Sequence, residues 1–286
     1  MKIFLTGGSG YIGKATISAL VRHGHTVEAL ARNDRAAETV RSLGAAPVRG
    51  GLGDLGVLNA AAARAEAVVH LAQAETGDED LAAATAMQDG IGTGTYVHTG
   101  GTWVYGDTNG VVDETAPWNP PPLVAWRKPV EEAVLRRAQH DGRPVVVQPG
   151  LLYGGENRLI DIFYATPGRK AKAIPCIGDG ANHWALVHID DMAELYVAAL
   201  KAKPGSVYVG VGGVNPTAKE CSLAVARAVG LDGKVVSLSL EEARDQMGPI
   251  ADAFVLDQQL TPARAEAELG WVPAHTDPLA VLNGGE

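Results

Sequence analysis

A run of closely spaced glycines at residues 6–13 is the stretch of this chain best suited to chemistry. It reads Thr6-Gly-Gly-Ser-Gly-Tyr-Ile-Gly13, with glycine at every third position from Gly7 to Gly13. Gly7 permits a tight turn, Gly10 lets the backbone approach a phosphate, and Gly13 lets a following helix lie close to a sheet. The free N–H groups at the start of that helix favour an anion. The stretch therefore predicts the pyrophosphate site of a dinucleotide cofactor.

The elements on both sides of this turn support that interpretation. Residues 1–5 form a short apolar run typical of a buried strand, residues 14–23 carry a helical apolar stripe, and residues 26–31 read as a second strand. Glycines also occur in flexible turns, and this spacing differs from the commoner Gly-x-Gly-x-x-Gly. A strand, a glycine turn, a helix and a second strand in this order favour a dinucleotide-binding βαβ unit.

The end of the second predicted strand indicates which cofactor is bound. NAD sites place an acidic residue there, which binds the ribose hydroxyls. Here that position is Arg32, followed by Asn33, with Arg35 close behind. A guanidinium pairs with the 2′-phosphate of NADP instead. The alternative is an ordinary solvent-exposed arginine at a loop start. We predict NADP(H) as the cofactor, with NAD(H) as the second choice.

Strands and helices alternate through the first half of the chain and become less regular in the second. Further strands are predicted at residues 46–50, 67–72, 95–99, 144–148, 185–189 and 206–210. Helices are predicted at residues 36–43, 57–65, 79–89, from 124 or 129 to 140, 159–164, 192–200, 217–229, 240–247 and 261–268, with Asp190 capping the helix at 192–200.

This alternation predicts an α/β protein, with a Rossmann-type doubly wound parallel sheet and a small C-terminal substrate lobe. The NADP-binding sheet domain is predicted to span residues 1–153, with 188–212 returning to it. The predicted lobe spans 154–187 and 213–286 and covers the carboxyl ends of the strands, where open parallel sheets bind their ligands.

The composition excludes several classes of partner and site. The 286 residues carry a formal net charge of -9, which argues against nucleic acid and anionic membranes as partners. Cys176 and Cys221 lie far apart, and no apolar run reaches the length of a membrane helix. The eight histidines show no metal-ligand spacing. We expect a cytoplasmic protein, a monomer or a homodimer, that binds a small-molecule substrate and no metal.

Six short motifs, in order along most of the chain, carry a resemblance to a known family. They are the glycine turn, His70-Leu-Ala72, Val104-Tyr-Gly106, Gln148-Pro-Gly-Leu-Leu-Tyr-Gly154, Val187-His-Ile-Asp-Asp191 and Leu269-Gly-Trp-Val-Pro273. The chain resembles the extended short-chain dehydrogenases/reductases, the NAD(P)-dependent epimerase/dehydratase group. Together with the features above, the resemblance implies cofactor contacts from Gly7, Ser9, Gly10, Tyr11, Ile12, Gly13, Arg32, Asn33, Arg35, Asp54, Leu55, Leu71, Ala72, Gln73, Thr99, Pro149 and Leu151.

The chain departs from this family at the catalytic positions. Members carry a Ser or Thr three residues before the Val of Val-Tyr-Gly and a catalytic Tyr-x-x-x-Lys on the next helix. Counting along the chain places Gly101, Trp126 and Val130 at these three positions. An indole N–H donates a hydrogen bond but is no acid near neutral pH. Lys128 is a poor replacement, because two helical positions turn it away from the site of Val130. The alternative is a helix that begins at Pro129, which would let Lys128 reach back.

Nearby side chains are candidates to replace the missing groups. Thr99 and Thr102 flank Gly101, and Tyr105 belongs to the Val-Tyr-Gly motif. A strand-end hydrogen bond for Thr99 and core packing for the aromatic residues are the alternatives. The substrate is expected to meet Gly100, Gly101, Tyr105, Trp126, Tyr153 and Trp184.

Three functions fit these features. The first is an NADPH-dependent ketoreductase, in which proximity and orientation drive hydride transfer and the proton comes from water, a stand-in side chain or the substrate. A phenol beside the ketone would suit this chemistry, and the chain resembles triad-lacking ketoreductases of aromatic polyketide antibiotic biosynthesis, of angucyclinone type. The second is a redox-neutral sugar-nucleotide epimerase or dehydratase, which needs the missing tyrosine. The third is a non-catalytic NADP-binding regulator. We favour the first.

Overall fold

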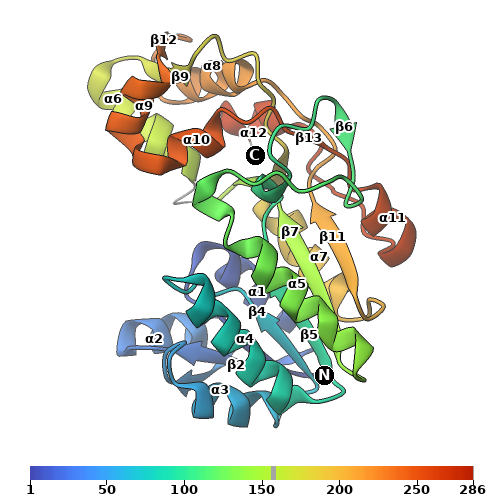
Figure 1. The fold of residues 1–286 in the computed structure, drawn as a ribbon. Helices are drawn as coiled ribbons and strands as arrows, with labels where there is room; N and C mark the ends of the chain where they lie inside the picture. The colour runs from blue at the N-terminus through green and yellow to red at the C-terminus, as the bar shows by residue number, and fades with distance from the viewer. Residues whose placement is uncertain (156–158, 286) are drawn as a thin grey trace.

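Seven parallel strands form the central sheet of the protein (Figure 1). The computed structural model describes residues 1–155 and 159–285. Across the sheet the strands are β3 (Ala46–Arg49), β2 (Thr26–Ala31), β1 (Lys2–Thr6), β4 (Ala67–His70), β5 (Thr95–Thr99), β7 (Arg143–Pro149) and β11 (Ser206–Gly210). The chain runs outward from β1 to β3 and then returns to β4 on the other side of β1. The helices that follow β1 and β4 therefore lie on opposite faces of the sheet, and such folds bind ligands at the carboxyl end of the strands between them.

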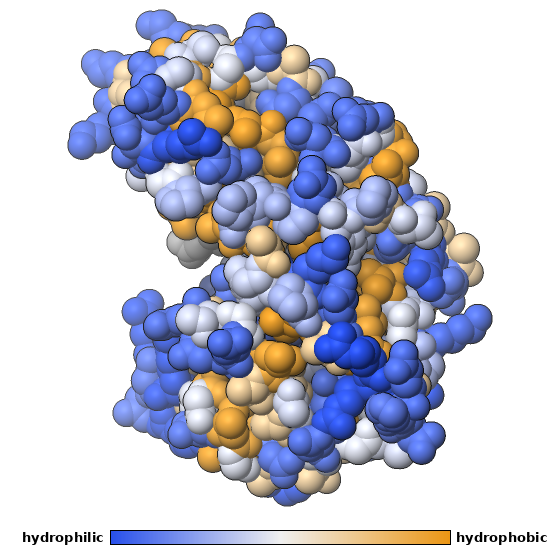
Figure 2. Space-filling view, in the orientation of Figure 1, coloured by the Kyte–Doolittle hydropathy of each residue, from blue (hydrophilic) through white to orange (hydrophobic). Residues whose placement is uncertain are grey.

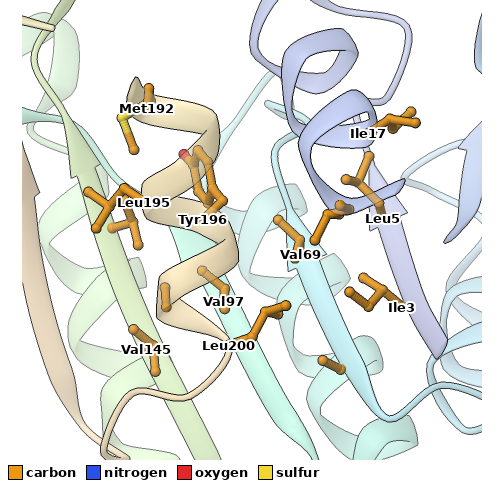
Figure 3. Packing of buried hydrophobic residues seen from close by; sticks show 14 of the residues in the cluster. Ile3, Leu5, Ile17, Val69, Val97, Val145, Met192, Leu195, Tyr196 and Leu200 are labelled. Carbon is orange, nitrogen blue, oxygen red and sulfur yellow. The ribbon is translucent and has the colours of Figure 1, made fainter. Parts of the chain in front are cut away.

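Both faces of the sheet are covered by helices, because successive side chains of a strand point to opposite faces. Ile3 and Leu5 of β1 are buried under α1 (Tyr11–Arg22), α2 (Asp34–Ser42) and α7 (Ile189–Ala199), as Figure 3 shows for part of this cluster. Phe4 is buried on the opposite face under α3 (Leu55–Ala62), α4 (Gly77–Ile91) and α5 (Arg127–Arg136). This sheet core fixes the loops that follow each strand.

The C-terminal lobe has a separate apolar core, in which Tyr164, Trp184 and Phe254 pack edge to face or tilted against one another. Its elements are α6 (Thr166–Ala171), β9 (Ile174–Ile177), α8 (Ala218–Ala228), β12 (Val235–Leu238), α9 (Leu240–Met247), α10 (Ala251–Phe254) and α12 (Pro278–Leu282), seen at the top of Figure 1. None of the helices in the described residues is both long and apolar enough to cross a membrane.

Shorter elements complete the fold, within the lobe and between the lobe and the sheet. Three pairs of parallel strands are β8 (Leu151–Tyr153) with β10 (Leu186–His188), β9 with β12, and β6 (Val111–Val112) with β13 (Gln259–Leu260). The helix α11 (Ala263–Leu269) lies beside β11, and short helical turns cover Thr102–Tyr105, Pro122–Val124, Arg137–Gln139, Asp161–Ala165 and Gly248–Ile250.

The predicted fold class is confirmed, but several short strands and helices of the second half were not predicted, and two differences have a clear physical reason. The helix α7 begins earlier than predicted, and Asp190 is not its cap: His188 is, and its Nδ1 accepts a hydrogen bond from the backbone N–H of Asp190 at 3.3 Å. The pair of strands β9 and β12 was not predicted, because each is only four residues long, Pro175 interrupts β9, and the two central residues of β12 are exposed. Residues 156–158 of the predicted lobe lie outside the described residues. The division of the chain at 153 and 154 stays a prediction.

The contact between α3 and α4 depends on a glycine. A Cβ on Gly90 would collide with the backbone carbonyl oxygen of Asn59, which cannot move without the helix. We therefore expect Gly90→Ala to lower the free energy of unfolding by about 1–3 kcal/mol, through overpacking. Gly56→Ala is the matched control, since a Cβ at this α3 position meets no atom within 4 Å. It should raise stability by about 0.5 kcal/mol. Urea denaturation measures both, and equal effects of the two substitutions would contradict this packing.

Candidate active site

Two connected cavities follow the carboxyl ends of the strands. The first has a volume of about 660 Å³ and lies at the carboxyl ends of β1, β2 and β4. The second, of about 400 Å³, shares Leu71, Ala72 and Gln73 with the first and extends past the ends of β5 and β7 to Leu159 and Ile250 of the lobe. Figure 2 shows the molecule hollowed between its sheet domain and its lobe. One cavity beside the glycine turn and a second beside the lobe are the arrangement expected of a site for a cofactor and a substrate.

The glycine turn fits a dinucleotide by its backbone. Gly7 has a φ of +75°, and a Cβ there would lie 2.7 Å from the amide nitrogen of Ala72, so the loops after β1 and β4 touch. A Cβ on Gly13 would collide with the carbonyl oxygen of Gly7. The helix α1 begins after Gly10 with no side-chain cap and no acidic residue in its first turn. Its free N–H groups therefore face the first cavity as an anion site.

Buried polar side chains lock the two loops together. The Thr6 hydroxyl accepts a hydrogen bond from the Ala72 backbone N–H at 3.2 Å and lies 2.6 Å from Nδ1 of His70. Both Thr6 and His70 are almost fully buried. These hydrogen bonds within the protein thus fix the crevice between β1 and β4, where the strand order reverses.

The two cavities bring together most of the residues predicted to contact the cofactor. The first is lined by Gly7, Ser9, Gly10, Arg32, Leu55, Leu71, Ala72 and Gln73, and the second adds Ile12, Thr99, Pro149 and Leu151. Sequence reasoning missed Leu30, Ala36, Glu75, Glu79 and Ala82 in the first cavity and Asp80, Leu123, Leu152, Leu159 and Ile250 in the second. Contact of any of these residues with a cofactor stays a prediction.

Five predicted cofactor residues line neither cavity. The Tyr11 hydroxyl donates a hydrogen bond to the carbonyl of Gly154, and Gly13 packs against Gly7. The Asn33 side chain caps α2 by accepting from the Ala36 N–H at 2.8 Å. Arg35 is exposed, and Asp54 accepts from the Gly51 N–H at 2.7 Å at the start of α3. These residues shape the loops around the site, while Arg32, exposed at its rim, faces the first cavity.

The predicted substrate residues divide in the same way. Gly100, Gly101 and Trp126 line the second cavity, and so do Thr102 and Trp103. The other three lie in packed cores with their polar atoms satisfied: Tyr105 donates to Oε1 of Gln148 at 2.5 Å, Tyr153 to the carbonyl of His275 at 3.0 Å, and Trp184 to the carbonyl of Phe254 at 2.9 Å. The Thr99 hydroxyl, a candidate stand-in, lies 2.9 Å from the Tyr196 hydroxyl on α7.

The three positions assigned to the missing triad are not equivalent. A Cβ on Gly101 would meet no atom within 4 Å, so the loop has room for a side chain there. Trp126 lines the second cavity, but Val130 is only 3% exposed and does not. The cation at this cavity is Arg127, which directly follows Trp126. Its guanidinium carbon lies 4.6 Å from the centre of the Trp126 ring, and its Nη1 donates to the Thr99 carbonyl at 3.3 Å.

A buried carboxyl lies beneath the cavity floor. Glu131, one helical turn after Arg127, is fully buried, and its Oε2 accepts a hydrogen bond from Nε2 of Gln148 at 2.8 Å. Its Oε1 has no partner among the described residues and would lie 2.5 Å from a Cβ on Gly100. Burial raises the pKa of Glu131 to about 7, against the opposing effects of the Gln148 bond and the Arg127 charge. Burial likewise lowers the pKa of Arg127, and the negative charges of Glu131 and Asp80 oppose that shift.

A second carboxylate is held at the cavity wall by two histidines. The carboxylate oxygens of Asp80 lie 3.6 Å from Nε2 of His70 and 3.6 Å from Nε2 of His98. All three are at least 97% buried, and Asp80 also lines the second cavity. Burial would raise the pKa of Asp80, but the His70 bond and the nearby imidazoles hold it below its ordinary value. Burial lowers the pKa of His98 to about 3. Asp80 is therefore an ionised carboxylate on the same cavity as Arg127.

Comparisons with known proteins agree with this architecture. A family model described as "NAD dependent epimerase/dehydratase family" matches residues 3–210. An uncharacterized protein of Schizosaccharomyces pombe is 28% identical over 96% of this chain and 96% of its own length. The 4-hydroxy-2-methyl-3-oxo-4-farnesyl-3,4-dihydroquinoline-1-oxide ketoreductase of Stigmatella aurantiaca is 26% identical, over 85% of this chain and 78% of its own. A dTDP-glucose 4,6-dehydratase of Bacillus anthracis, solved with NAD, has a similar fold: its TM-score is 0.82 at 17% identity, covering 99% of this chain and 94% of that one.

The raised pKa of Glu131 predicts a pH dependence of stability. Its folded-state pKa of about 7 exceeds the ordinary value of 4.5, so the folded protein binds more protons than the unfolded chain between these values. The contribution of Glu131 to stability therefore falls as the pH rises through this window. Glu131→Gln keeps an acceptor for Gln148 and cannot ionise. From pH 5 to pH 8 the wild type should lose about 2 kcal/mol of unfolding free energy relative to this variant. Urea denaturation at both pH values tests this, and parallel changes in the two proteins would refute it.

Proposed function

The chain belongs to the NAD-dependent epimerase/dehydratase family, so it is an NAD(P)-dependent enzyme of oxidoreductase type, and we propose that it is an NADPH-dependent ketoreductase. Its proposed substrate is a flat ketone of aromatic polyketide type with an acidic hydroxyl beside the carbonyl. One observation carries the proposal: among the described residues that line the second cavity there is no tyrosine, lysine or histidine. A substrate that brings its own acidic proton fits such a cavity.

The side chains around the second cavity can bind and orient such a molecule but cannot act as its acid. Trp103, Trp126 and Leu123 offer flat apolar surface, and Thr99 already hydrogen-bonds Tyr196. Asp80 is ionised, and an arginine keeps its proton at every pH of interest. When bound, the cofactor supplies a hydride to the carbonyl carbon. The resulting alkoxide then takes a proton from the neighbouring phenol, and water restores the proton of the phenol.

A relative supports the ketone part of this substrate class. The name of the Stigmatella aurantiaca ketoreductase places a 3-oxo group on a partly reduced quinoline ring system. The neighbouring 4-hydroxyl is on the carbon that also carries the farnesyl group, so it is an alcohol and not a phenol; the acidic hydroxyl of our proposal rests on the cavity lining alone. The alternative of a redox-neutral epimerase or dehydratase has less support, because such a reaction begins with a base that removes a proton from an alcohol. Asp80, the ionised carboxylate on the second cavity, is a weak base because its pKa lies below the ordinary value.

The most direct test is NADPH oxidation at 340 nm with three ketones of one skeleton. We expect 8-hydroxy-1-tetralone, whose phenol flanks the ketone, to react at least about tenfold faster than 6-hydroxy-1-tetralone or 1-tetralone. The 6-hydroxy compound is the matched control, since its phenol is too remote to reach the carbonyl oxygen. Equal rates for all three would contradict substrate-assisted reduction. No turnover of any ketone, with NADPH still bound, would instead favour the non-catalytic regulator.

We also propose that Arg32 selects NADP, because it faces the first cavity and makes no ion pair within 4.0 Å among the described residues. Arg32→Asp should weaken NADPH binding by at least about tenfold, since a charge-assisted contact to the 2′-phosphate becomes a repulsion. NADH binding should change far less. Arg41→Asp, an exposed charge reversal on α2, is the control. Fluorescence titration measures the affinity for both cofactors. An equal loss of affinity for NADPH and NADH would show that Arg32 does not bind the 2′-phosphate.

A further inference from the structure

We propose that Arg127 is the catalytic residue that binds both oxygens of the substrate, the ketone oxygen and the phenol oxygen beside it. This inference rests on the proposed ketoreductase function and names the group that holds the reacting atoms. It also replaces the interpretation, drawn from residue counting, that Trp126 and Val130 take the place of the catalytic pair.

The position of Arg127 is that of a group aimed at a ligand. Its side chain lines the second cavity together with Thr99, Gly101 and Trp126. A guanidinium has five N–H donors in a planar fork. Within residues 1–155 and 159–285, Arg127 makes one hydrogen bond, from Nη1 to the Thr99 carbonyl, and no ion pair within 4.0 Å. Donors of this half-buried guanidinium therefore remain available to the cavity.

The surroundings keep this arginine charged and fixed. The Trp126 ring lies over the guanidinium, and the Thr99 carbonyl binds one of its ends. Asp80 on the cavity wall and Glu131 one helical turn away both favour the charged form. Both carboxylates lie beyond direct ion-pair distance. They therefore favour the charged guanidinium without forming hydrogen bonds to its N–H groups. A positive group held in a partly dry cavity stabilises developing negative charge more strongly than it would in water.

The helix places Arg127 where Val130 cannot reach. Leu123 and Arg127 both line the second cavity, whereas Val130 is packed inward and Lys128 is exposed. The cavity-facing side of this segment therefore carries an arginine and no tyrosine. A guanidinium stabilises an oxyanion but does not release its proton near neutral pH. This is the reason that the substrate has to bring an acidic hydroxyl.

The proposed step balances in atoms and charge. NADPH, when bound, would supply the hydride and be oxidised to NADP⁺. As the hydride adds to the carbonyl carbon, the electron pair of the C=O π bond moves to oxygen, giving an alkoxide beside the guanidinium. The alkoxide takes the proton of the flanking phenol, which becomes a phenolate on the same guanidinium. Water then protonates the phenolate and leaves hydroxide to the buffer. The planar fork suits two oxygens separated by three carbons, as in a ketone with a neighbouring phenol.

Binding of 8-hydroxy-1-tetralone in the presence of NADP⁺ tests the contact without turnover. The near-ultraviolet absorbance of the ligand reports ionisation of its phenol. In the wild-type complex the pKa of the bound phenol should lie at least about one unit below that of the free ligand, because the guanidinium favours the phenolate. Arg127→Gln should abolish the shift. Lys128→Gln removes the neighbouring exposed charge and should leave the shift unchanged. An unshifted phenol in the wild type, or an equal shift in Arg127→Gln, would overturn the assignment.

Kinetics separate a substrate contact from a cofactor contact. Arg127→Gln should lower kcat/KM for 8-hydroxy-1-tetralone by at least about a hundredfold while NADPH affinity changes less than about threefold. A loss of NADPH affinity as large as the loss of turnover would show that Arg127 holds the cofactor, and would overturn the proposal. Arg127→Lys, which keeps the charge but not the fork, should retain part of the phenol shift and keeps the test possible if the glutamine variant fails to fold. If the wild type shifts the phenol pKa but reduces no ketone, the proposed function fails while the assignment of the binding group stands.

Discussion

The close approach of the loops after β1 and β4 is the constraint on which the rest of the site depends. Gly7 lies so near the Ala72 amide that no Cβ fits between them, and the Thr6 hydroxyl joins the two loops by binding that amide. This contact sets the width of the crevice at the switch in strand order. It also leaves the first turn of α1 uncapped toward the crevice, so that backbone N–H groups offer the anion site.

Ionisable side chains lie in and beneath the wall of the second cavity. Glu131 occupies the space under Gly100, which explains why that position cannot carry a side chain. Arg127 lies one helical turn earlier and lines the cavity, as Asp80 does. A buried carboxyl with a raised pKa, an ionised carboxylate and an arginine share one small region. Burial is the largest single influence on each pKa; the charges of Arg127 and Asp80 also act on Glu131, and those of Glu131 and Asp80 on Arg127, whereas Asp80 responds to its two histidines. Among the described residues that line this cavity there is an arginine but no tyrosine, lysine or histidine, which is the basis of our proposal of electrostatic stabilisation in place of a side-chain acid.

Much of the fold could be predicted from the sequence because its strands are short, apolar and separated by glycine turns. The strands Thr26–Ala31, Thr95–Thr99 and Ser206–Gly210 have their predicted bounds. The charged network could not be predicted in the same way. His70, Asp80 and His98 meet only because β4, α4 and β5 are neighbours in space. Arg127 was missed because counting residues from a family motif assigns positions along the chain, whereas the start of the helix decides which side chain faces the cavity. The sequence did hold one indication of it: Arg127 and Glu131 are spaced one helical turn apart.

The central claim is that this protein reduces a ketone with a proton supplied by the substrate and none supplied by a side-chain acid. The pH dependence of kcat/KM tests it most directly, measured for 8-hydroxy-1-tetralones whose ring substituents vary the pKa of the phenol over about two units. In such a profile the free substrate and free enzyme reveal their own ionisations. The account predicts that the pH at which the rate falls moves with the pKa of each substrate. One common midpoint for every substrate would reveal an acid on the protein and contradict the account.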